Sequence, residues 1–153
     1  MAMKKLPWSV EELLPHSGLM MLLDDAIAAG EGWVEAGVRI GEDSLLYESG
    51  LGVPAWAGIE FMAQTVAMYS GIQKKQAGEQ VKIGFLLGTR RYETMTDYFT
   101  LGDYLRIHVR EEWQDGQMAV FDCRIENTAC LATARINVYQ PQDISTVINR
   151  GDE

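Results

Sequence analysis

Apolar and polar residues alternate in four stretches of the chain, 34–40, 105–110, 119–125 and 132–139. A period of two residues is typical of β-strands that bury one face and expose the other. The Asp115-Gly116 dipeptide separates the second stretch from the third and favours a tight hairpin turn. We therefore expect the second half of the chain to form mostly antiparallel sheet.

The N-terminal region has a less regular pattern, which predicts one helix and two strands. Ser9 and Glu12 have the spacing of a capping box and precede two leucines, so we expect a short helix that ends at Pro15. An apolar run at 19–27 leads to a glycine-containing turn at 30–32 and then to the first alternating stretch. This arrangement predicts two strands joined by that turn.

One long helix is predicted between these strand regions, over about 54–76. The segment PAWAGIEFMAQTVAMYSGIQKKQAG starts at Pro54, in the favoured first turn, and ends at Gly78 after two lysines. Its apolar residues cover every direction of a helical wheel, and such a helix is expected to be surrounded by protein. The order strand, strand, helix, strands indicates an α+β fold in which an antiparallel sheet of five to six strands wraps around one central helix.

The domain organisation is simple. The chain has 153 residues, a length typical of one domain, and it contains no internal repeat and no proline-rich linker. We therefore expect a single domain at 1–142, followed by a C-terminal tail at 143–153.

Charge and cysteine content exclude several classes of protein. The formal net charge of -9 argues against nucleic acid as a partner, because no basic stripe offsets it. The pattern of a signal peptide is missing and no apolar stretch is long enough to cross a bilayer, so a cytoplasmic protein without membrane contact is expected. Cys123 and Cys130 lack the spacing of a metal or redox site, so we expect small buried hydrophobic residues and no metal.

Glu60 is the candidate for chemistry, because it is the one ionisable residue in the first turns of the predicted helix. A carboxylate buried among apolar residues must find a partner or take up a proton, which makes it a candidate acid or base. Gln64 and several small residues share its face and leave room for another backbone or a thin ligand. A structural interpretation remains open, in which Glu60 bonds a neighbouring strand or a symmetry mate across a dimer interface.

Three motifs resemble those of the hot-dog β-hydroxyacyl-ACP dehydratases. PxxxxxExMAQ at 54–64 is similar to the central-helix signature of that family, LLPHSGLMMLLDD at 13–25 to its N-terminal segment, and KIGFLLGTRRYE at 82–93 to the strand after the helix. The segments GVPAWAGIEFMAQ and IGFLLGTRRYE most closely resemble the corresponding segments of the dehydratase-like subunits encoded with aryl-polyene pigment pathways. The resemblance implies the hot-dog fold.

The resemblance implies a component of a 3-hydroxyacyl-ACP dehydratase, with Glu60 as the general acid that protonates the departing hydroxyl. In that family a histidine removes the α-proton, and counting back from Pro54 places Leu46 at its position. Because the two groups of a hot-dog dimer come from opposite subunits, the resemblance implies a homologous partner subunit that carries the histidine. The chain's own histidines do not replace it: His16 matches a non-catalytic family position, and His108 is expected on the exposed face of a strand.

The resemblance also implies a substrate and the residues that bind it. The acyl group would arrive as a thioester on the phosphopantetheine of an acyl carrier protein, and no other cofactor is expected. Arg90 and Arg91, with Lys82 behind them, form the best cationic patch for an acidic carrier protein. The residues expected to bind substrate are Pro54, Trp56, Gln64, Phe85, Gly88 and His16.

Two other functions remain open. A thioesterase could use Glu60 alone as nucleophile or general base, and a non-catalytic acyl-binding or scaffold subunit would need no catalytic group. We expect a dimer, either with the histidine-bearing subunit or with a second copy, because a sheet around one helix leaves an edge to pair. The resemblance places 84–88 near the centre of that dimer.

Overall fold

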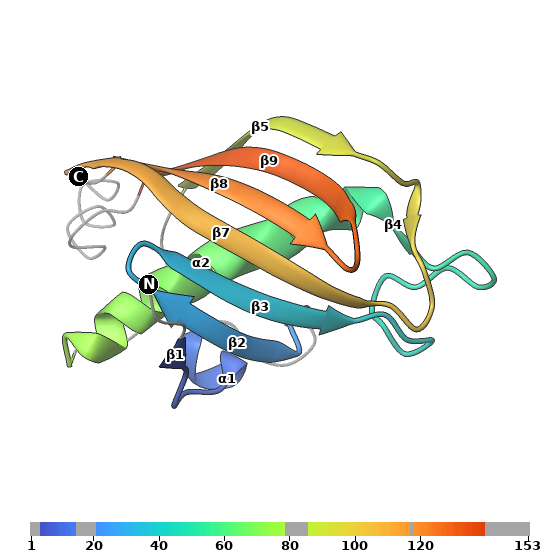
Figure 1. Cartoon of the computed structure of the whole chain (residues 1–153), viewed down its shortest axis with the longest axis horizontal. Helices are drawn as coiled ribbons and strands as arrows, with labels where there is room; N and C mark the ends of the chain where they lie inside the picture. Colours follow the sequence, from blue (N-terminus) through green and yellow to red (C-terminus); the bar gives the residue numbers. More distant parts are fainter. Residues whose placement is uncertain (1–3, 15–20, 79–85, 117, 140–153) are drawn as a thin grey trace, which may run out of the picture.

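A computed structural model gives the fold of the chain and describes residues 4–14, 21–78, 86–116 and 118–139. A long helix crosses one face of a curved antiparallel sheet (Figure 1). The expected α+β architecture is therefore confirmed. In chain order the elements are β1 (Lys4–Lys5), α1 (Val10–Leu13), β2 (Asp25–Gly30), β3 (Trp33–Arg39), β4 (Val53–Pro54), the 3-10 helix η2 (Ala55–Ala57), α2 (Gly58–Gln76), β5 (Leu86–Thr94), β6 (Tyr98–Phe99), β7 (Tyr104–Asp115), β8 (Met118–Glu126) and β9 (Cys130–Tyr139).

The main sheet has seven strands in the order β1-β2-β3-β7-β8-β9-β5, so β1 and β5 form its two edges. Five or six strands were expected. The difference arises from β1, whose two residues are too short to show a period, and β4 and β6 add a separate two-stranded pair. The predicted hairpin at Asp115-Gly116 is confirmed, with a φ of +59° at Gly116 that suits glycine in a tight turn.

The apolar run at 19–27 does not form a strand along its length, because β2 begins only at Asp25. Leu22 is instead tied to the central helix, since its backbone N–H donates to the side-chain oxygen of Gln64 at 2.9 Å. Asp24 then accepts a bond of 2.7 Å from the backbone N–H of Arg39. These contacts hold the described part of the run, 21–24, as a connection between the helix and the sheet.

The central helix matches its predicted bounds, with a 3-10 first turn at Ala55–Ala57 and an α-helix from Gly58 to Gln76. It ends at Gln76, two residues before Gly78, whose φ of +74° suits a glycine that follows a helix. Phe61, Met62, Val66 and Met68 of α2 are almost fully buried against the sheet, mainly over β3 and β7. This apolar burial is the main stabilising contribution to the domain.

One face of the helix is not covered by any described part of the chain, which corrects the expectation of a helix surrounded on all sides. We call this the open helix face, and it consists of Trp56, Ile59, Glu60 and Ala63. Trp56 is 59% exposed and Glu60 is also exposed, whereas Ile59 and Ala63 are half-buried. A large exposed aromatic side chain beside apolar neighbours is typical of a surface that another molecule covers.

The short helix α1 forms as predicted and packs closely against α2. The Ser9–Glu12 capping box is complete, with both the side-chain and the backbone bonds of the motif present. Gly71 of α2 makes the close approach possible, because a Cβ at this position would overlap the Leu13 carbonyl oxygen. The small residue expected to admit another backbone thus admits the backbone of α1.

Gly71→Ala is expected to lower the free energy of unfolding by about 1–3 kcal/mol, because the backbone of α1 must shift and the overlap outweighs the better helix propensity of alanine. Urea denaturation followed by circular dichroism measures the change. Gly88→Ala is the matched control, since a Cβ at Gly88 meets nothing within 4 Å. Equal stability of the two variants would contradict this packing.

Three smaller expectations have mixed outcomes. Cys123 is buried as expected, and this burial raises the pKa of its thiol. Cys130 is exposed, contrary to expectation, because it lies at the first position of β9, where the strand enters the sheet from a loop.

The tail at 143–153 lies outside the described residues. Within the described ranges, no helix is long and apolar enough to span a bilayer.

Candidate functional site

Glu60 lies in the first turn of α2, where the positive end of the helix dipole favours a carboxylate. Its side chain is exposed in the single chain, so the expected burial in an apolar core is wrong. The segment around it is apolar because its other residues, such as Phe61 and Met62, face the sheet. Among the described residues no ion pair includes Glu60, so the alternative of a bond to a strand of its own chain has no support.

The beginning of the helix is fixed against the edge strand β5. Tyr92 of β5 donates a short hydrogen bond from its hydroxyl to the backbone carbonyl of Ala55. Gly58 permits this approach, because a Cβ there would overlap the same hydroxyl. Burial of the ring raises the pKa of Tyr92 to about 12. The edge strand therefore sets the position of the turn that carries Glu60.

Tyr92→Phe is expected to lower the free energy of unfolding by about 1 kcal/mol near pH 8, because the Ala55 carbonyl loses its donor. The folded-state pKa of Tyr92 is raised above the ordinary value of 10.0, so its contribution is complete below pH 10 and is lost as the pH rises toward about 12. Urea titrations at pH 8, 10 and 12 of both proteins should show the difference shrinking. A difference that grows with pH would contradict this role.

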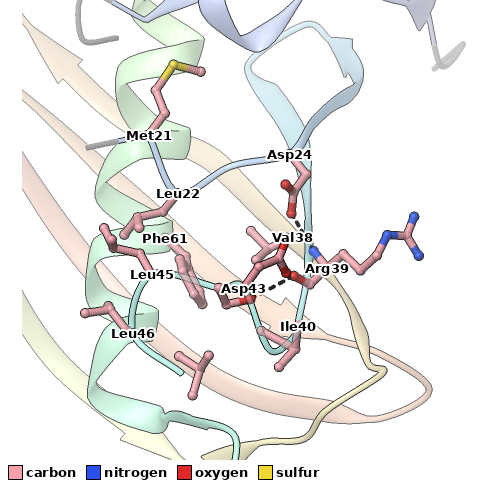
Figure 2. A pocket seen from close by; sticks show the side chains of 12 residues that line it. Met21, Leu22, Asp24, Val38, Arg39, Ile40, Asp43, Leu45, Leu46 and Phe61 are labelled. Carbon is pink, nitrogen blue, oxygen red and sulfur yellow. Dashed lines mark hydrogen bonds between the residues drawn. The ribbon is translucent and has the colours of Figure 1, made fainter. Parts of the chain in front are cut away.

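A pocket of about 250 Å³ lies beside the helix, between the end of β3 and the loop that follows it (Figure 2). Its floor is apolar, and its mouth carries two carboxylates, Asp24 and Asp43. Of the residues predicted to bind substrate, those that the structure describes, Pro54, Trp56, Gln64 and Gly88, are not among its lining residues. The lining residues are Met21, Leu22, Asp24, Val38, Arg39, Ile40, Asp43, Ser44, Leu45, Leu46, Val53 and Phe61.

Leu46, which takes the position of the family histidine, is half-buried and lines this pocket. No histidine among the described residues lies there. His108 lies on the outer face of the sheet as expected, although it is partly covered, because it stacks on Trp33 with ring centroids 5.4 Å apart and approaches Glu35 at 3.4 Å. The described residues thus present one candidate acid and no base, whereas dehydration needs both groups.

The predicted substrate-binding residues have different positions in the structure. Trp56 shares the open helix face with Glu60, while Pro54 is buried in β4 just before the helix. Gln64 lies one turn after Glu60 and has a structural role through its bond to Leu22. Gly88 is exposed on the edge strand β5. Phe85 and His16 lie outside the described residues, as does Lys82 of the cationic patch.

Arginines from several strands line a groove of about 700 Å³ on the outer face of the sheet. Arg91 lies in it, at an irregularity of β5 with a φ of +55° that is unusual for a residue other than glycine. Arg90 pairs with Arg135 in the strand register. Arg110, Arg124 and Arg135 also line the groove and were not predicted to belong to the cationic patch, although alternation predicts their outward position. We call Arg91, Arg110, Arg124 and Arg135 the arginine groove.

Solved structures share the fold. The dehydratase heterocomplex ApeI:P from Xenorhabdus doucetiae contains a chain that is 29% identical, covers 93% of this chain and 98% of its own length, and superposes with a TM-score of 0.82. The E. coli PaaI protein from the phenylacetic acid degradation operon is 14% identical over 76% of this chain and 78% of its own, with a TM-score of 0.58. A hypothetical thioesterase of Streptococcus pneumoniae, solved with coenzyme A, is 12% identical over 71% and 77%, with a TM-score of 0.54.

The fold and these likenesses define a hot-dog protein, as the sequence motifs implied. No curated protein matches the chain. The sequence profile of the ApeP-like family, described as ApeP dehydratase, matches residues 8–149. The chain therefore belongs to the ApeP-like dehydratase family.

Proposed function

We propose that this chain is the acid-bearing subunit of a 3-hydroxyacyl-ACP dehydratase, and that a homologous subunit supplies the base. One observation carries the proposal: Glu60 is exposed on the open helix face, while the pocket residue at the position of the family histidine is Leu46. A site that holds a candidate acid without a base, next to an uncovered helix face, suits a reaction whose second catalytic group comes from another subunit.

The reaction follows from the two groups. The partner's base removes the α-proton of the 3-hydroxyacyl thioester, and the electrons of that C–H bond form the new double bond. The C–O bond to the β-hydroxyl breaks, and the carboxyl group of Glu60, which must enter this step carrying a proton, gives that proton to the departing oxygen. The products are the enoyl thioester and water, and return of the proton from the base to Glu60 completes the cycle.

The edge strand β5 and the open helix face support a partner of the same fold. One side of β5 pairs with β9, and none of the described strands pairs with its other side. A second sheet can add to such an edge through backbone hydrogen bonds. In that arrangement the first half of β5, including Gly88, lies near the centre of the dimer. The similar Xenorhabdus chain is part of a dehydratase heterocomplex, which favours a different subunit over a second copy.

The arginine groove is the surface we assign to an acidic carrier protein. Arg91 and Arg110 are in none of the ion pairs among the described residues, whereas Arg135 contacts Asp122 at 3.1 Å and Arg124 contacts Glu126 at 3.8 Å. Four carboxylates, those of Glu93, Glu112, Asp122 and Glu126, also line the groove, so the attraction for anions is local to the guanidinium groups of Arg91 and Arg110. Arg91 lies next to Tyr92, which contacts the turn before Glu60, so the groove and the acid are linked through one strand.

Mixing the chain with a histidine-bearing hot-dog homologue tests the proposal. The purified chain alone should show almost no conversion of a 3-hydroxyacyl-ACP, while the mixture should form the enoyl thioester. Mass spectrometry of the carrier-bound acyl group detects the loss of water, and a thiol reagent detects hydrolysis in the same sample.

The readout also separates the alternatives. Free thiol released by the chain alone would favour a thioesterase that uses Glu60 by itself. An acyl-ACP that binds without change, even in the mixture, would favour a scaffold subunit. Rapid dehydration by the chain alone would show that the partner histidine is unnecessary.

A further inference from the structure

Three exposed leucines lie at the end of the molecule where α2 begins. Leu45, Leu51 and Leu101 are 55%, 54% and 47% exposed. They belong to the loops at 41–52 and 100–103, which lie at the right of Figure 1. Large apolar side chains that are exposed on neighbouring loops are typical of a surface that another molecule covers.

Hydrogen bonds hold the two loops together. The backbone N–H of Ile40 donates to the carbonyl of Asp103 at 2.9 Å, and the N–H of Gly102 donates to the carbonyl of Ile40 at 2.8 Å. The pairing of β4 with β6 connects the same part of the chain a second time. The three leucines are therefore parts of one surface with a defined shape.

The charge around the leucines is entirely negative. The ranges 41–52 and 95–103 contain no lysine, arginine or histidine. Arg39, which precedes the first loop, lies over the ring of Tyr104, 5.2 Å from its centroid. None of the ion pairs among the described residues includes a carboxylate of these ranges. We call the leucines and these carboxylates the loop-end surface, which consists of Leu45, Leu51, Leu101, Glu42, Asp43, Glu48, Asp97 and Asp103.

The hydroxyl of Tyr98 in β6 responds to this charge. It donates to the carboxylate of Glu48 at 3.4 Å. The negative charge of Glu48, and to a smaller extent that of Asp97, raises the pKa of Tyr98. This effect on an exposed hydroxyl indicates that the carboxylates act on groups at the surface.

We propose that the loop-end surface binds a protein segment that carries lysine or arginine side chains beside an apolar strip, as a basic amphipathic helix does. The leucines supply apolar area for burial, and the carboxylates attract and orient the cations. The same charge disfavours an acidic carrier protein, an anionic membrane and a second copy of this surface, because each would bring like charges together.

This surface is separate from the proposed dehydratase site. It shares no residue with the open helix face or with the arginine groove, and it does not include Leu46. The regular first half of β5, where we place the homologous subunit, is also outside it. The inference therefore does not rest on the proposed function.

A fluorescent amphipathic peptide of leucine and lysine, about 14 residues long, tests the proposal by anisotropy titration with the purified chain. Leu51→Ser combined with Leu101→Ser should weaken its binding by about tenfold or more, because apolar burial is lost. Glu48→Gln combined with Asp97→Asn should weaken it by about threefold or more, and added salt should act in the same direction. A peptide with glutamate in place of lysine should not bind.

Matched variants at the opposite end of the sheet control for the general attraction between an acidic chain and a basic peptide. Glu31→Gln combined with Asp115→Asn changes the net charge equally, in the turns before β3 and after β7. Trp113→Ser combined with Met118→Ser removes apolar side chains of similar exposure, 52% and 42%. Both double variants should bind the peptide as the unmodified chain does.

Equal weakening by the loop-end variants and the opposite-end variants would overturn the assignment, as would equal binding of the glutamate peptide. Binding to phosphatidylglycerol vesicles that is lost in the leucine variant would assign the surface to lipid and overturn the proposal. The charge variant keeps the shape of both side chains, so it carries the test if the leucine variant does not fold. Failure of dehydration in the mixed complex, with peptide binding intact, would contradict the proposed function alone.

Discussion

Glu60→Gln is expected to reduce dehydration by the mixed complex by about a hundred- to ten-thousand-fold, the usual contribution of a positioned general acid. The amide keeps the shape of the side chain and cannot supply the proton. Because Glu60 is exposed in the single chain, the free energy of unfolding should change by no more than about 0.5 kcal/mol. Initial rates of enoyl-ACP formation, together with urea denaturation of the same preparation, measure the two quantities.

Glu42→Gln is the matched control for this experiment, because Glu42 is also an exposed carboxylate but lies in the loop after β3. It should leave the rate unchanged. Size-exclusion chromatography should show that both variants still assemble with the partner. Full turnover by Glu60→Gln in an intact mixed complex would remove Glu60 from the mechanism, and a large loss of stability would indicate the structural interpretation.

Leu46→His is expected to give the chain alone a dehydratase activity at least about a hundredfold above its background, since a base would then stand where the family histidine stands. Each copy in a self-dimer would offer its histidine to Glu60 of the other. Adding Glu60→Gln to the variant should abolish the gained activity. The rate of enoyl-ACP formation by purified protein, without any partner, is the measurement.

Leu51→His serves as the control for this gain of function, because it introduces the same ring at an exposed loop position. A Leu46→His protein that folds and self-associates but remains inactive would show that position 46 does not correspond to the base. Activity in both variants would indicate that the imidazole acts without a defined position.

The parts of the fold that follow from local patterns were predictable. Alternation fixes which face of β7, β8 and β9 is buried, and Pro54 and Gly78 mark the ends of the helical region because of their own backbone preferences. The start of β2 was not predictable, since an apolar run does not reveal that Leu22 bonds to Gln64, which is far away in sequence.

The candidate site shows a similar division. The motif around Glu60 made it the candidate acid, but helical periodicity could not show that its face is open, because apolar residues on an uncovered face look the same in sequence as residues of the core. The arginine groove was only partly predicted for another reason. Arg91 and Arg110 lie on different strands, and only the pairing of the whole sheet brings them to one groove.

The two edges of the sheet differ, and this difference limits how far the protein can assemble. β1 is a strand of only two residues, too short to template another strand, whereas β5 has nine residues with an irregularity after Arg90 that leaves its first half as the regular part. Antiparallel joining of two such β5 edges uses the same surface twice and leaves no further long edge. For the described strands, growth by strand addition would therefore stop at a pair, and such an end point would prevent the open-ended stacking that produces fibres.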